Sequence, residues 1–89
     1  MSHLFSIEAF KYEAGKTTSQ LEEVVSETTL TFPYNRRAPG KTGVKALGKH
    51  LNKDLKYVTT TESDKEGFVV MVLDGDDSLI VYFTNQGAA

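Results

Sequence analysis

Residues 67–83 have the sequence GFVVMVLDGDDSLIVYF, in which two apolar runs, 68–73 and 79–83, surround the acidic turn 74–77. Asp-Gly accepts the positive φ angles of a type I′ turn, so the sequence predicts two antiparallel strands joined by a tight hairpin. Neither run alternates apolar and polar side chains, as an antiparallel strand with one solvated face would. We therefore expect both faces of this hairpin to be covered.

The segment before the hairpin predicts a helix and a further strand. Residues 41–55 predict an amphipathic helix, because apolar side chains recur there every three or four residues and share an arc of about 80°. Residues 56–62 are rich in threonine, which is typical of a strand, and residues 63–66 form a turn into the hairpin. The apolar stripe of the helix consists of Val44, Leu47, Leu51 and Leu55.

The N-terminal third predicts two more strands, the second of which has an alternative. Residues 4–13 place apolar side chains at alternate positions and predict a strand. Residues 21–34 are rich in β-branched side chains, which favours a strand that pairs with the first and ends at Pro33. Ser19-Gln20-Leu21-Glu22 also fits a capping box, so a short helix through Val25 remains the alternative.

These elements predict an α+β domain in the order ββαβββ, with a mostly antiparallel sheet and one amphipathic helix. The length of 89 residues fits a single domain, residues 1–89. Residues 85–89 are small and polar, and we expect them to form a frayed tail. One helix covers one sheet face, so the other must be covered by the N-terminal hairpin or by a second chain. A homodimer or an obligate partner surface is therefore a hypothesis.

Charge is segregated along the chain although the net charge is only −2. Residues 1–34 carry two lysines and five glutamates, and residues 58–89 carry one lysine and six acidic residues. Residues 35–57 carry seven cations and one aspartate, a local charge of +6. Charge asymmetry of this kind concerns the partners of a protein rather than its fold.

Several kinds of chemistry are disfavoured by the sequence. Cysteine is absent, which excludes disulfides and cysteine-ligated metals. Asp74, Asp76 and Asp77 lack the spacing of a calcium loop. His3 and His50 stand alone, without a nucleophile or further ligands at a suggestive spacing. We expect no metal, no cofactor and no catalytic residue, and hence a protein that is not an enzyme.

Gly40-Lys41-Thr42 resembles the end of a phosphate-binding P-loop. That motif needs a glycine five residues before Gly40, and Asn35 stands there. Pro39 also removes one of the backbone N–H donors that would hold a phosphate. The sequence therefore favours a simple turn into a basic helix.

The basic segment is the strongest candidate for a binding site. Lysines on successive turns of a helix can follow a nucleic-acid backbone, and neighbouring arginines can add phosphate contacts. Tyr34 and Tyr57 flank the segment and could stack on bases. The plain alternative is a solvated helix face. The predicted basic surface comprises Arg36, Arg37, Lys41, Lys45, Lys49, Lys53 and Lys56.

A second hypothesis is a protein-interaction or inhibitor module, as in small bacterial or phage accessory proteins. Such a module would dock on a larger protein through the apolar sheet face or through the acidic tip at Asp74, Asp76 and Asp77. The partner is then either a nucleic acid or a larger protein. We expect no membrane span, because no long apolar run is present, and a cytoplasmic location is the default.

Overall fold

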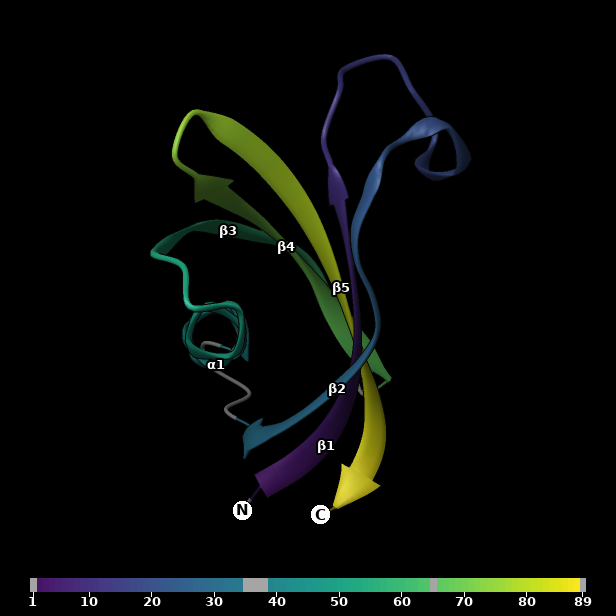
Figure 1. Ribbon diagram of the computed structural model, residues 1–89. Coiled ribbons are helices and arrows are strands. Elements are labelled where there is room, and N and C mark those ends of the chain that lie inside the picture. Colours follow the sequence, from purple (N-terminus) through teal and green to yellow (C-terminus); the bar gives the residue numbers. More distant parts are fainter. Residues whose placement is uncertain (1, 35–38, 65, 89) are drawn as a thin grey trace.

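The computed structural model describes residues 2–34, 39–64 and 66–88, which form a five-stranded antiparallel sheet and one α-helix (Figure 1). This arrangement fits the predicted α+β class. A short 3₁₀ helix between the first two strands makes the order of elements slightly different from ββαβββ. The strand order in the sheet is β2-β1-β5-β4-β3. The elements are β1 (Ser2–Lys11), η1 (Thr18–Gln20), β2 (Glu23–Pro33), α1 (Pro39–Leu51), β3 (Leu55–Asp64), β4 (Gly67–Asp74) and β5 (Asp77–Ala88).

The predicted hairpin is present as β4 and β5, but its turn is of a different type. Asp74 pairs with Asp77, so Gly75 and Asp76 are the two central residues of the turn. Gly75 has a φ of 62°, whereas Asp76 is not among the described residues with positive φ. Positive φ at the first central position alone is the pattern of a type II′ turn, so the prediction of a type I′ turn was wrong.

The helix ends at Leu51, four residues before the predicted end at 55. Asn52 has a φ of 56°, which places it in the left-handed region, and its N–H donates to the carbonyl of Lys49 over 3.3 Å. The N–H of Lys53 donates to the carbonyl of Gly48 over 2.9 Å. These two bonds form a Schellman motif, which stops a helix. Leu55 packs against the core from β3 instead.

The connection between β1 and β2 contains only one short helical turn. Residues 18–20 form the 3₁₀ helix η1, and the backbone N–H of Thr17 donates to Gln20 Oε1 over 3.0 Å. The strand interpretation of residues 21–34 holds for 23–33, and the alternative of a helix continuing through Val25 was wrong. Val25 faces the core from β2, where the β-branched side chain packs well.

The C-terminal segment is not frayed over residues 85–88, contrary to prediction. β5 continues to Ala88, and β1 pairs with it as far as His3. His3 Nδ1 lies 3.1 Å from Asn85 Oδ1, and the N–H of Asn85 donates to the carbonyl of Glu66 over 2.7 Å. The prediction relied on the polar composition of this segment. It did not consider that β1 could pair with the segment through backbone hydrogen bonds. Residue 89 lies outside the described residues.

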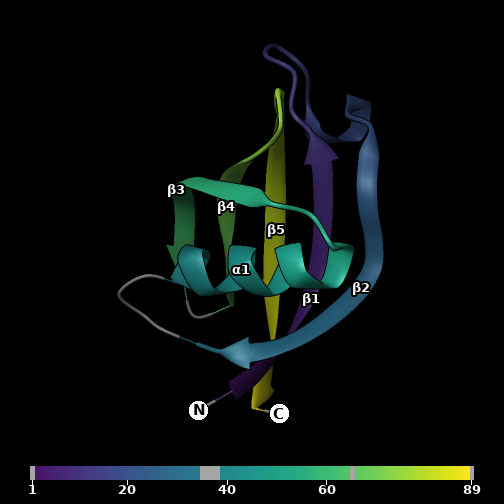
Figure 2. The same cartoon turned by 60° about the vertical axis from the view of Figure 1, so that its left-hand side comes forward.

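A single hydrophobic core lies between α1 and the sheet. Figure 2 shows α1 in front of the sheet, where it crosses the strands. Phe5 stacks on Phe32 and meets Phe83 edge to face, with ring centroids 4.5 and 6.4 Å apart. From the helix, Val44 and Leu47 are buried against these rings and the strands. The helix has 13 residues, and no helix among the described residues is long and apolar enough to cross a membrane.

Gly40 brings the first turn of α1 onto β3 and β4. A Cβ atom at this position would lie 2.5 Å from Tyr57 Cε1 and 2.7 Å from Val70 Cγ1, distances that real Cβ atoms do not reach. The glycine of the P-loop-like motif therefore serves close packing.

Gly40→Ala should destabilise the protein by about 1–3 kcal/mol, the usual cost of overpacking a well-filled site. Urea unfolding followed by circular dichroism measures this difference. The matched control is Gly15→Ala in the β1–β2 connection. No atom lies within 4 Å of the built Cβ of Gly15, so only its φ of 82° is strained. A loss at Gly40 below the loss at Gly15 would contradict the packing argument.

Candidate functional site

Three lysines lie on the side of α1 that faces away from the sheet. Lys41, Lys45 and Lys49 are exposed, whereas Val44 and Leu47 on the opposite side are buried. A spacing of four residues places the lysines on successive turns, about 6 Å apart along the helix axis. We call Lys41, Lys45 and Lys49 the lysine face.

Two further predicted members of the basic row leave the lysine face because the helix ends at Leu51. Lys53 lies in the turn before β3, and its Nζ is 3.0 Å from Asp74 Oδ2. Lys56 lies on β3 opposite Leu73, between two residues, Leu55 and Tyr57, that pack against the core. Side chains alternate along a strand, so Lys56 points to the sheet face away from α1. The prediction that all five lysines share one arc was wrong. Asn52, a common helix-stop residue, was the signal that could have corrected it.

The remaining four predicted contact residues either lie outside the described residues or pack against neighbouring side chains. Arg36 and Arg37 lie outside the described residues. Tyr34 is half-buried, with its ring centroid 5.4 Å from that of His3 and 5.9 Å from that of Phe5. Tyr57 is also half-buried and packs against the core under Gly40. Both tyrosines therefore contribute to the packing of the core.

Tyr57 nevertheless helps to position the lysine face. The Nζ atom of Lys41 lies 6.0 Å from the centroid of the Tyr57 ring, at the outer limit of a cation–π contact. The Tyr57 hydroxyl is 2.8 Å from Thr60 Oγ1, which holds the ring on β3. The first lysine of the row is thus placed against a fixed ring.

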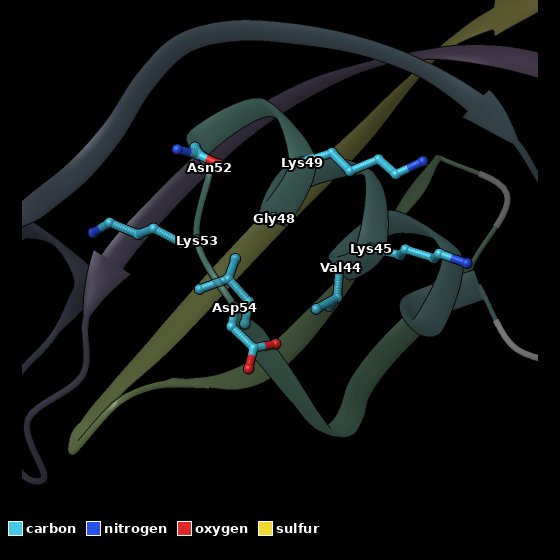
Figure 3. A pocket seen from close by; sticks show the side chains of 8 residues that line it. Val44, Lys45, Gly48, Lys49, Asn52, Lys53 and Asp54 are labelled. Carbon is cyan, nitrogen blue, oxygen red and sulfur yellow. The ribbon is translucent and has the colours of Figure 1, made fainter.

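A groove of about 470 Å³ borders the lysine face at the C-terminal end of α1 (Figure 3). Gly48 contributes no side chain, and a Cβ atom there would lie 3.0 Å from the carbonyl oxygen of Lys53. In Figure 3, Lys45 and Lys49 extend to one side and Lys53 to the other, with Asp54 at the edge. Lys53 is paired with Asp74, and Asp54 also lines the groove, so Lys45 and Lys49 supply its unpaired positive charge on one side.

Two of the three carboxylates of the acidic tip are paired within the chain. Asp74 pairs with Lys53, and Asp77 Oδ2 lies 3.7 Å from the Nζ of Lys11. Asp76 forms no ion pair with any residue of the described ranges. One carboxylate of the predicted three is therefore available to a partner without breaking an internal pair.

The acidic and histidine side chains of the described ranges are spread over the molecule rather than clustered. No group of three or more His, Asp or Glu side chains in these ranges could hold a metal ion. A hydrogen bond and the positive charge of Lys16 lower the pKa of Glu13, but both side chains are exposed on the β1–β2 connection. This pair is an ordinary surface ion pair.

Comparison with known proteins found no family model, no curated protein and no solved structure that matches the chain.

Helix α1 ends at Leu51, which separates Lys53 from the lysine face. Substitutions of Asn52 test whether its left-handed backbone conformation stabilises this helix end. Asn52→Ala should cost about 1–2 kcal/mol because alanine is strained in the left-handed region, whereas Asn52→Gly should be neutral or slightly stabilising. Thermal or urea unfolding of both variants makes the comparison. Equal losses in the two variants would assign the effect to the asparagine side chain rather than to its backbone conformation.

Proposed function

We propose that this is a small, non-catalytic binding protein that docks on a polyanion, a nucleic-acid backbone or an acidic protein surface, through the lysine face of α1. The observation that carries the proposal is the exposure of Lys41, Lys45 and Lys49 on successive turns of one helix. Helix α1 contains no acidic residue, so no carboxylate of the same helix neutralises the row.

The distribution of charge over the rest of the molecule supports an oriented encounter. The chain carries twelve acidic residues and ten lysines and arginines. The described acidic side chains lie in the strands and turns, outside α1. A polyanion is therefore attracted by one side of the domain and repelled by others, which favours a single docking orientation.

The first test measures binding of a fluorescein-labelled DNA duplex by anisotropy as a function of salt. Three phosphate contacts predict a loss of affinity of roughly 40-fold between about 50 and 200 mM salt, and Lys45→Glu should flatten the slope by about one unit or more. The matched control is Lys56→Glu, which changes the net charge equally on the opposite face of the sheet. It should leave the slope nearly unchanged.

The outcomes separate the two polyanions. If a labelled polyglutamate peptide binds with the same dependence on Lys45 while the duplex does not, the target is an acidic protein surface. Absence of binding to both at low salt, or equal effects of Lys45→Glu and Lys56→Glu, would contradict docking through the lysine face.

A second candidate, a protein-interaction module, is favoured by the sheet face turned away from α1. Phe68, Val70 and Val72 of β4 are buried in the core. The alternation of side chains therefore places Met71 on the outer face, together with Leu73, which is 37% exposed. This face supports docking on a larger protein or on a second copy of the chain.

Part of the outer face is covered by the chain itself. The Tyr82 hydroxyl on β5 is 3.0 Å from Thr18 Oγ1 of η1, and the Tyr82 ring meets that of Phe10 edge to face, with the ring centroids 5.8 Å apart. The connection between β1 and β2 thus shields this end of the face, and Phe10 is only 8% exposed. Less of the outer face therefore remains to be covered by a second chain.

Sedimentation velocity at micromolar concentrations tests the homodimer. A dimer that uses the outer face should dissociate in Met71→Lys, whose side chain would be desolvated without a partner in the interface. His50→Lys, an exposed position on α1 at the other side of the sheet, is the control for added charge. A monomer in the wild-type protein would remove the homodimer and leave docking on a larger protein.

A further inference from the structure

A second hollow lies on the concave side of the sheet, beyond the C-terminal end of α1. In Figure 2 the strands β1, β4 and β5 continue past the helix toward the β4–β5 turn. Helix α1 crosses the strands before this point and leaves this end of the concave face uncovered. A cavity of about 150 Å³ is found there, between α1, β2 and the ends of β1 and β5.

The inner wall of the cavity is apolar. It is formed by side chains from four elements, and three of them, Ala9, Val25 and Leu79, are buried members of the core. Leu47 and Leu51 of α1 complete the wall. A cavity of this size with an aliphatic lining can hold one six-membered ring.

The rim of the cavity carries charge of both signs with an excess of carboxylates. Lys11 pairs with Asp77 and Lys53 pairs with Asp74, at N–O distances of 3.7 and 3.0 Å. Asp74 and Asp77 lie directly opposite each other in the β4–β5 ladder. Glu22 also lines the cavity and forms no ion pair in the described part of the chain. Three carboxylates face two ammonium groups, so the rim attracts one additional positive charge.

We propose that this cavity binds a small primary amine with an apolar body, of the size of an aralkylamine. The apolar body occupies the space between Leu47, Val25 and Leu79, where it displaces water from aliphatic surface. The ammonium group lies at the rim and donates hydrogen bonds to carboxylates that the two lysines only partly neutralise. This site is independent of the proposed polyanion docking, because none of the three lysines of the lysine face lines the cavity.

Three ring compounds of similar shape and different charge test the proposal. Benzylamine is cationic at neutral pH, benzyl alcohol is neutral and benzoate is anionic. Each is titrated into ¹⁵N-labelled protein, and amide shifts are followed by NMR. Benzylamine should give saturable shifts at residues 9, 25, 47 and 79 and bind about threefold or more tightly than benzyl alcohol. Benzoate should bind most weakly of the three.

Two variants separate the apolar wall from the charged rim. Ala9→Val adds two methyl groups into the cavity and should abolish binding of all three compounds. Glu22→Gln should weaken benzylamine by about two- to threefold and leave benzyl alcohol unchanged. The matched control is Glu66→Gln, an exposed carboxylate in the turn at the other end of β4, which should alter neither. If Ala9→Val does not fold, the comparison of the two glutamate variants decides the question.

Benzoate binding as tight as that of benzylamine, shifts that do not saturate, or shifts located elsewhere would overturn the proposal. Equal effects of Glu22→Gln and Glu66→Gln would also overturn it. Loss of polyanion binding in Lys45→Glu with intact benzylamine binding is the expected pattern. The two proposals can therefore fail separately.

Discussion

The structure depends on the burial of one concave sheet face by a helix of 13 residues. Phe5, Phe68 and Phe83 form a ring cluster on β1, β4 and β5, with Phe68 and Phe83 stacked at 4.6 Å. Val44 and Leu47 are the buried helix side chains that close it. Burial of apolar area is the main favourable term in the stability of a domain this small, so every other feature must be compatible with this contact.

Close approach of α1 to the sheet explains its glycines. A Cβ at Gly43 would lie 3.0 Å from Phe83 Cε2, and a Cβ at Gly40 would lie closer still to Tyr57. A Cβ at Gly48 would crowd the returning backbone of Lys53. Glycine in a helix costs about 1 kcal/mol relative to alanine, and here this cost is offset by packing that a larger side chain would prevent.

The sequence predicts most of the sheet and the central turns of the helix, because these follow from apolar periodicity. The strands and the lysine face are visible in the spacing of Phe5, Ile7 and Ala9 and of Lys41, Lys45 and Lys49. The helix end was mispredicted because Leu55 continues the apolar spacing, although the left-handed Asn52 interrupts the helix before it. The pairing of β5 with β1 was equally invisible. Residues 85–88 are ordered by β1, more than 80 positions earlier in the chain, and no local pattern encodes that contact.

The position of the helix end also determines how charge is distributed, which local spacing could not show. Lys53 lies beyond the helix and pairs with Asp74 of the β4–β5 turn. Leu51 and Lys53 both line the cavity, so the chain leaves the helix at its edge. Asn52, whose backbone is left-handed, thus ends the helix between the lysine face and the rim of the cavity, which carries charge of both signs.

The lysine face is the feature of α1 that packing leaves unexplained. Lys41–Lys45 and Lys45–Lys49 are like-charge pairs at a spacing of four residues, and each such pair destabilises a helix by about 0.2–0.5 kcal/mol. None of the three forms a described ion pair. A glutamate at any one of these positions would relieve the repulsion without disturbing the core, because all three side chains are exposed. Violations of local stability rules on an exposed surface are typical of functional sites, so the repulsion among the three lysines favours a binding role for the lysine face over a merely solvated one.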